Sequence, residues 1–154
     1  INGDYVLIYD MYHDPGLREI AKKIAKNKNA MVIALSRMIL PDMKIKTLKN
    51  ISPSNFLWLF KNARVIVTDS FHGTVFSVNF NKEFYTYCPE RGKKISGRIT
   101  CFLDSMRLNE RIVSDPNNFS VSDIDYRETN KILLKFRHES FDYLRGAIGF
   151  DKNE

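Results

Sequence analysis

The sequence VIVTDSFHGTVF, at residues 65–76, passes from a strand pattern to a helix pattern within one short segment. Val65–Thr68 is a run of β-branched residues, which is typical of a parallel strand that is buried on both faces. Two candidate helix caps follow, Asp69 and Ser70, and the apolar residues after them suit a short helix, although residues 76–80 also alternate like a strand. We therefore expect a strand, a loop and a helix in immediate succession.

The alternation of strand and helix continues in both directions from this segment. Apolar or alternating runs predict further strands at residues 5–9, 30–35, 44–48 and 84–87. Capping residues followed by apolar residues at helical spacing predict helices that begin near Asp14, Ser52 and Asp125. In the helix after Ser52, the expected buried face consists of Phe56, Leu57 and Phe60. Another helix is expected through Ile99, Phe102, Leu103 and Met106.

Strands that alternate with helices along the whole chain indicate the α/β class, with a Rossmann-like open, mostly parallel sheet and helices on both faces. The 154 residues suit one hydrophobic core, and no composition shift marks a second domain. We therefore expect residues 1–154 to form a single Rossmann-like domain.

The composition is ordinary for a soluble globular protein, with 44% hydrophobic and 27% charged residues. The apolar stretches are too short to cross a bilayer, and residues 1–5 lead into a strand-like run rather than a signal sequence. Cys88 and Cys101 lack the spacing of metal ligands and are expected to be reduced thiols. These observations predict a cytoplasmic protein without a metal ion or cofactor. They leave its oligomeric state and any peripheral association with a membrane open.

The net charge is +6, from 24 basic and 18 acidic residues. Such a balance suits nucleic acid, an anionic membrane surface or a small anionic substrate. Many of the lysines fall on the outward faces of predicted helices, where charged side chains are usually just solvated. No stretch interleaves basic and aromatic residues in the manner of a nucleic-acid stacking platform, so we expect no nucleic-acid partner.

The loop after Val65–Thr68 is the richest candidate for a ligand site. In open parallel sheets, ligands bind beyond the carboxyl ends of the strands, and the N–H groups and dipole at a helix start favour an anion. His72 can donate to an anion or transfer a proton near neutral pH. The candidate binding residues beside it are Asp69, Ser70, Gly73 and Thr74.

The residues of this loop also have structural interpretations. Asp69 or Ser70 can serve only as a helix cap, and His72 can be a structural side chain. His13 lies in a turn, and His138 lies on a long helix with no obvious partner, so we expect both at the surface or its boundary.

A second candidate loop, at residues 91–98, follows a strand and precedes a helix, so it should open on the same side of the sheet. We expect Arg98 at the helix start, where a cation opposes the helix dipole. An anionic ligand there would remove the conflict, and arginine binds phosphate or carboxylate with two hydrogen bonds. Equally, Arg98 could pair with a nearby carboxylate. The other candidate binding residues are Lys93, Lys94, Ser96 and Gly97.

Several well-known catalytic motifs are missing from the sequence. It has no Walker-type loop, no G-x-G-x-x-G fingerprint, no H-E-x-x-H and no G-x-S-x-G. These absences weigh against a nucleotide hydrolase, a dinucleotide-dependent dehydrogenase, a zinc protease and a typical serine hydrolase.

Residues 61–77, KNARVIVTDSFHGTVFS, resemble the most distinctive segment of the polysaccharide pyruvyl transferase family. Residues 81–84, 96–99 and 108–112 resemble its following blocks in the same order, so the resemblance runs from about residue 50 to residue 113. Asn55 departs from the family, which commonly has an acidic residue there. A Glu would complete a capping box at that position, so the change could be structural, or it could alter the choice of acceptor.

The resemblance implies the carboxyl-terminal half of a GT-B-type fold, in which two Rossmann-like halves face a cleft, with the amino-terminal half absent. It implies an enzyme that transfers pyruvate from phosphoenolpyruvate to a sugar of a cell-surface polysaccharide or glycan precursor. His72 and Arg98 match the histidine and arginine that bind the donor and are the expected catalytic residues. This half alone is expected to be inactive.

Two other functions stay open at this point. The first is a glycosyltransferase that uses a nucleotide-sugar on the same architecture. Its donor domains often carry a pair of glutamates, and Glu83 and Glu90 do not have the required spacing. The second is a glycan-assembly domain without catalytic activity, against which the intact His72 and Arg98 weigh.

Overall fold

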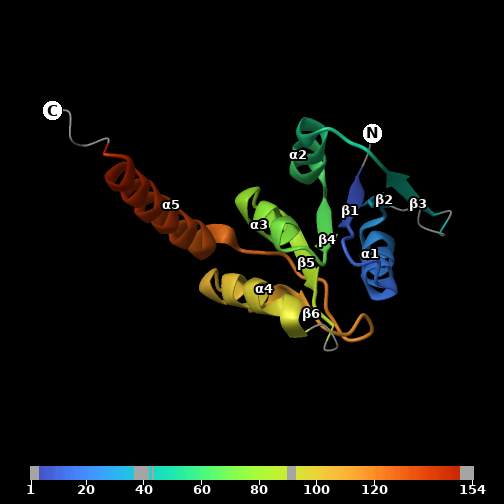
Figure 1. The fold of residues 1–154 in the computed structure, drawn as a ribbon. Helices are drawn as coiled ribbons and strands as arrows, with labels where there is room; N and C mark the ends of the chain where they lie inside the picture. The colour runs from blue at the N-terminus through green and yellow to red at the C-terminus, as the bar shows by residue number, and fades with distance from the viewer. Residues whose placement is uncertain (1–3, 37–41, 43, 90–92, 150–154) are drawn as a thin grey trace.

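The computed structural model describes residues 4–36, 42, 44–89 and 93–149, and for residues 93–96 it describes the backbone alone (Figure 1). All pairings in its sheet are parallel, in the order β3-β2-β1-β4-β5-β6. The strands are β1 (Tyr5–Tyr9), β2 (Met31–Leu35), β3 (Ile45–Leu48), β4 (Val65–Thr68), β5 (Glu83–Tyr87) and β6 (Ile112–Val113). The predicted α/β class with a Rossmann-like parallel sheet is confirmed.

Helices separate most of the strands along the chain, whereas β3 follows β2 in the order of described elements. The helices are α1 (Pro15–Lys28), α2 (Pro53–Asn62), α3 (Phe71–Asn79), α4 (Lys93–Ser105), the 3-10 helix η2 (Asn109–Arg111) and α5 (Tyr126–Ile148). Residues 71–79 form a helix rather than the alternative strand. The short strand β6 and η2 were not predicted.

Local capping explains where several helices begin. The Asp14 carboxylate accepts a hydrogen bond from the N–H of Gly16, and a proline follows at the first helical position of α1. Ser52 caps α2 in the same way, with its hydroxyl accepting the N–H of Asn55. Asp125 caps α5. These starts depend on neighbouring residues, which is why the sequence predicts them.

Side chains of each strand alternate between two hydrophobic layers. Val6 and Ile8 of β1 pack in the layer covered by α1, whereas Tyr5 and Leu7 pack in the layer covered by α2, α3 and α4. The two layers explain why the strands are apolar throughout, because both faces of the sheet are covered.

Helices α2 and α5 leave exposed some apolar side chains that helical spacing would place on a buried face. In α2, Leu57 is 40% exposed and Leu59 is buried instead, so the expected position of Leu57 on the buried face was wrong. Helix α5 projects away from the sheet in Figure 1, and beyond its first turns it leaves large apolar side chains such as Phe141 and Leu144 exposed.

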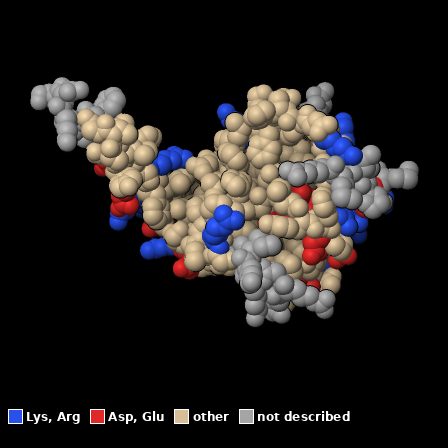
Figure 2. Space-filling view, viewed as in Figure 1, with Lys and Arg blue, Asp and Glu red and all other residues tan. Residues whose placement is uncertain are grey.

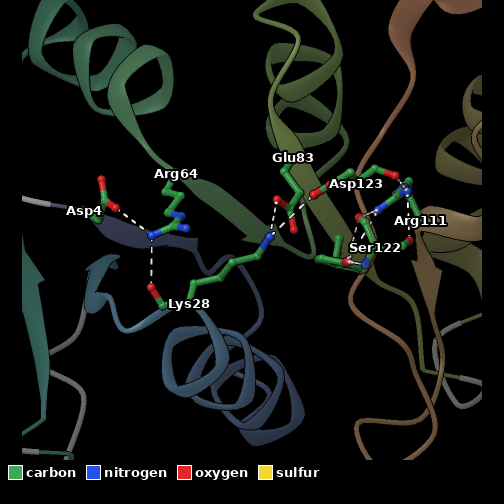
Figure 3. Close-up of polar contacts among 8 residues, drawn as sticks. Asp4, Lys28, Arg64, Glu83, Arg111, Ser122 and Asp123 are labelled. Carbon is green, nitrogen blue, oxygen red and sulfur yellow. Dashed lines mark hydrogen bonds and ion pairs between the residues drawn. The ribbon is translucent and has the colours of Figure 1, made fainter.

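Polar contacts hold the amino-terminal edge of the sheet, where the parallel strands begin (Figure 3). Lys28, at the end of α1, pairs with Glu83 at the start of β5, with 3.0 Å between Nζ and Oε2. The Arg111 guanidinium is buried and donates to the carbonyl oxygens of Ser122 and Asp123 at 2.7 and 2.8 Å. Arg111 therefore fastens the segment between β6 and α5 to the domain.

Charged side chains are distributed over the face shown in Figure 2. Lysine and arginine side chains lie there in separate groups, with broad uncharged surface between them, and do not gather into one stripe. Of the helices that the structure describes, none combines the length and the apolar character needed to cross a bilayer.

Candidate functional site

The strand order identifies where a ligand should bind. From β1 the chain proceeds outward to β2 and β3, and it then returns to place β4, β5 and β6 on the other side of β1. The direction of winding therefore reverses between β1 and β4, and in open α/β sheets the crevice outside the carboxyl ends at this point binds ligands. Tyr9 and Thr68 are paired at the ends of these two strands, so the loops that follow them are neighbours.

Asp69 connects these two loops. Its Oδ1 accepts the N–H of Met11 at 2.9 Å, and its Oδ2 accepts the N–H of Tyr12 at 3.1 Å. Burial raises the pKa of the Asp69 carboxyl above its ordinary value, and these two N–H donors oppose that shift. Both carboxylate oxygens are thus engaged within the protein, and binding of substrate by Asp69 stays a prediction.

Gly73 allows helix α3 to lie close against the sheet. A Cβ added there would lie 2.4 Å from Thr68 Oγ1, which is closer than real Cβ atoms approach an atom, and 3.0 Å from Cδ1 of Tyr9, which is a tight contact. Thr68 cannot easily move, because its hydroxyl donates to the carbonyl of Tyr9 at 2.9 Å and accepts the N–H of Ser70 at 3.1 Å. The glycine therefore determines how closely α3 begins beside β4 and β1.

Ser70 and Thr74 are buried beneath the start of α3. The Ser70 hydroxyl accepts the N–H of Gly73 at 3.5 Å, so Ser70 caps the helix. The Thr74 hydroxyl donates to the Ser70 carbonyl and lies 3.0 Å from the hydroxyl of Thr86 on β5. Both side chains have structural partners, and their contact with substrate stays a prediction.

His72 and Arg98 approach the same aromatic ring from two different helices. Both residues are exposed. The His72 ring lies edge-on to Phe71, with 6.0 Å between ring centroids, and Cζ of Arg98 lies 5.3 Å from the Phe71 centroid. The structure thus brings an imidazole from α3 and a guanidinium from α4 to one exposed region at the carboxyl edge of the sheet.

The expected position of Arg98 at a helix start was wrong. Helix α4 begins at Lys93, so Arg98 lies in its second turn and does not face the unpaired N–H groups. Within the described part of the chain, Arg98 forms no ion pair, and its contact is the ring of Phe71. Gly97 is exposed and has open space around it. The side chains of Lys93, Lys94 and Ser96 lie outside the described residues, as does Glu90.

The sequence reasoning missed a pair at the end of β1. The Asp10 side chain is fully buried, and its Oδ1 accepts the N–H of His13 at 2.7 Å. The His13 Nδ1 lies 3.4 Å from the other carboxylate oxygen and 3.5 Å from the hydroxyl of Ser36. His13 is half-buried, which agrees with its expected position at the boundary of the surface. The available signal was the place of Asp10 directly after a buried strand, at the edge where ligands bind.

Other potentially reactive groups do not form a second centre in the part of the chain that the structure describes. No group of three or more His, Cys, Asp or Glu residues there could hold a metal ion. Burial, together with the charge of Asp69, raises the pKa of the Cys88 thiol to about 11, so Cys88 is a poor nucleophile at neutral pH.

Comparison with known proteins places the chain in a family. No curated protein matches the sequence significantly. The solved structure of UDP-GlcNAc 2-epimerase from Methanocaldococcus jannaschii is similar at 18% sequence identity with a TM-score of 0.47, over 86% of this chain and 38% of the epimerase chain. A sequence model of the family described as polysaccharide pyruvyl transferase matches residues 1–87, which include His72 but end before Arg98. Because this match spans more than half of the 154 residues, the chain belongs to the polysaccharide pyruvyl transferase family.

Proposed function

We propose that the chain forms the donor-binding part of an enzyme that transfers pyruvate from phosphoenolpyruvate to a sugar as a ketal. Membership of the family supports the reaction class. The observation that carries the proposal is the shared contact of His72 and Arg98 with the ring of Phe71, beside the start of α3. A small ligand with several negative charges suits this combination of an imidazole, a guanidinium and a helix amino terminus.

The start of α3 supplies further donors for the anion. The first N–H groups of a helix have no partner within it. The hydroxyl of Ser70 accepts the N–H of Gly73, and its carbonyl oxygen accepts the N–H of Thr74. The N–H groups of Phe71 and His72 are left without a partner among the described residues. Together with the helix dipole, these two N–H groups favour the phosphate or carboxylate of phosphoenolpyruvate.

The reaction that we propose balances without a cofactor. The methylene carbon of phosphoenolpyruvate gains a proton, which makes the adjacent carbon electrophilic, and a sugar hydroxyl attacks that carbon. The carbon–oxygen bond to phosphate breaks, and a second hydroxyl of the sugar closes the ketal. The two sugar hydroxyls release two protons. One of them replaces the proton that was added to the methylene carbon, and the other protonates the departing phosphate. His72 serves either as the acid or as a ligand of the phosphate, and Arg98 stabilises the negative charge.

Transfer by the complete protein tests this proposal. The protein is incubated with phosphoenolpyruvate and candidate glycans, and mass spectrometry detects a pyruvate ketal on the glycan. We expect His72→Ala to abolish transfer while the circular dichroism spectrum is unchanged. His138→Ala is the matched control, because His138 is an exposed histidine on α5. Wild-type turnover by the His72 variant would remove His72 from the catalytic role.

A binding measurement separates this function from transfer of a nucleotide-sugar. Only the true donor should raise the melting temperature of the protein, because a ligand that binds the native state stabilises it. Glu83, one of the two glutamates considered for a nucleotide-sugar donor, begins β5 at the opposite edge of the sheet and pairs with Lys28. Stabilisation by a nucleotide-sugar and none by phosphoenolpyruvate would overturn the proposal.

A further inference from the structure

The ring of Phe71 connects two helices that cover the same face of the sheet (Figure 1). Phe71 is the first residue of α3 and is partly buried against the apolar layer that α4 also covers. Its ring meets the ring of Phe102 on α4 edge to face, with 5.9 Å between centroids. Arg98 lies four residues before Phe102 on α4, and its Cζ lies over the Phe71 ring at 5.3 Å from the centroid. Because residues four apart are neighbours on a helix surface, α4 presents both side chains to one ring of α3.

The position of the Phe71 ring is fixed by the structure around it. Phe71 directly follows Ser70, whose hydroxyl caps α3, and Gly73 lets the first turn of the helix lie close to β4. Phe102 is itself partly buried in the same apolar layer. Arg98, in contrast, is exposed. The ring therefore offers a fixed support to a side chain that is otherwise in contact with solvent.

An aromatic ring holds a guanidinium without neutralising it. The face of the ring attracts a cation through its quadrupole and carries no net charge. A carboxylate at the same place would form an ion pair and cancel the charge that an anionic ligand needs. Among the described residues, Arg98 has neither an ion-pair partner nor a hydrogen-bond acceptor. Its charge and its N–H donors therefore remain available to a ligand.

Such a support should strengthen the binding of an anion. A long, exposed arginine loses rotamer freedom when it binds a ligand, and this loss weakens binding. Contact with the ring of Phe71 restricts Arg98 before the ligand arrives, so less freedom is lost on binding. The same contact keeps the guanidinium near His72, the next residue in the chain, whose ring lies 6.0 Å from that of Phe71.

We propose that Phe71 is a positioning residue, whose ring holds the guanidinium of Arg98 ready, with its charge unpaired, for the anionic group of the ligand. The identity of that ligand as phosphoenolpyruvate rests on the proposed function. The support of Arg98 by the ring does not, because it can be measured in the protein without any ligand.

A first measurement detects the contact in solution. NMR spectra are recorded on the complete protein, labelled with ¹³C and ¹⁵N in arginine alone, and Arg98→Lys identifies the signals of Arg98. Protons above an aromatic ring are shifted upfield, so we expect the side-chain protons of Arg98 to be shifted relative to those of Arg145. No described ring lies over the Arg145 guanidinium, which makes it the control. The shift should disappear in Phe71→Leu.

A second measurement separates attraction between charge and ring from simple packing. Phenylalanine with one, two or three fluorine atoms on its ring is incorporated at position 71, which nearly preserves the size of the ring and progressively weakens its attraction for a cation. Calorimetry follows the binding of phosphoenolpyruvate. We expect the affinity to fall stepwise, by about two- to fivefold at three fluorines, which is the strength of an exposed contact of this kind. The same series at Phe76, which is also partly buried on α3 and has no described cation over its ring, should leave the affinity unchanged.

Ordinary substitutions keep the test decisive if the fluorinated proteins do not fold. Phe71→Tyr retains an aromatic ring that attracts a cation and should bind phosphoenolpyruvate within about twofold of the wild type. Phe71→Leu is apolar without such a ring, and it should bind about two- to fivefold more weakly.

The outcomes distinguish the positioning role from the proposed function. If the Arg98 signals of the wild type show no upfield shift, or if the changes at position 71 leave the affinity unchanged, the positioning role is overturned. An equal loss in the Phe76 series would assign the effect to packing and would also overturn it. If the wild type does not bind phosphoenolpyruvate, the donor assignment fails, and inorganic phosphate becomes the probe. A stepwise loss of phosphate affinity at position 71 then supports the positioning role, whereas unchanged or absent phosphate binding overturns it.

Discussion

Replacing Gly73 by alanine tests whether the close packing of α3 against Thr68 requires a glycine at this position. The new Cβ would lie 2.4 Å from Thr68 Oγ1, whose hydroxyl is held by two hydrogen bonds. Overpacking of this kind costs about 1–3 kcal/mol, and so close an approach indicates the upper end of that range. Alanine recovers about 1 kcal/mol of helix propensity, so we expect a net loss of about 2 kcal/mol.

Gly97→Ala provides the matched control for this experiment. Gly97 also lies in a helix, but an added Cβ meets nothing within 4 Å, so alanine should stabilise the protein by about 1 kcal/mol. For a chain of this size, each kcal/mol shifts the melting temperature by roughly 2–4 °C. Thermal unfolding should therefore show a fall of about 4–8 °C for Gly73→Ala and a rise of about 2–4 °C for Gly97→Ala.

A double-mutant cycle identifies the atom responsible. In a Thr68→Ala background, the hydroxyl that the new Cβ would meet is gone, so Gly73→Ala should cost at least about 1 kcal/mol less than in the wild type. If Gly73→Ala is as stable as Gly97→Ala, or if Thr68→Ala does not change its cost, close contact with Thr68 is not the reason for the glycine.

Three further predictions concern groups around the site and the opposite edge. Because burial raises the pKa of Asp69, its folded form holds the proton more tightly than the unfolded chain, and its ionisation lowers stability as the pH rises above about 4. In urea unfolding, the wild type should therefore lose stability relative to Asp69→Asn between pH 4 and pH 7, and a relative gain by the wild type would contradict this. Iodoacetamide at pH 8 should alkylate the exposed Cys101 well before Cys88, whose thiol has a pKa raised to about 11 by burial; peptide mass spectrometry that finds equal rates would refute it. Arg111→Lys keeps the positive charge but loses the guanidinium N–H groups that donate to two carbonyl oxygens, so it should lower the free energy of unfolding in urea by about 2–4 kcal/mol. The exposed Arg127→Lys should lower it by less than about 1 kcal/mol.

Much of the secondary structure can be predicted because its causes are local. Runs such as Val65–Thr68 are apolar on both faces, and a capping side chain with its acceptor lies within three residues of the N–H that it binds, as at Asp14 and Ser52. Sequence patterns detect such short-range relations directly. The start of α4 was misplaced because Lys93 has no such cap signal before it, so the apolar spacing from Ile99 onward suggested a later start.

The chain by itself determined the alternation of strands and helices, the loop that carries His72, and the family resemblance that points to an anionic donor. Only the tertiary structure decided that β1 and β4 are neighbours, that Asp69 binds the loop after β1, and that Arg98 meets the same ring as His72. It also revealed the buried acceptor of Asp10 beside His13. The physical reason is that strand order depends on how whole layers pack against each other, so contacts between residues far apart in sequence leave no periodic pattern along the chain.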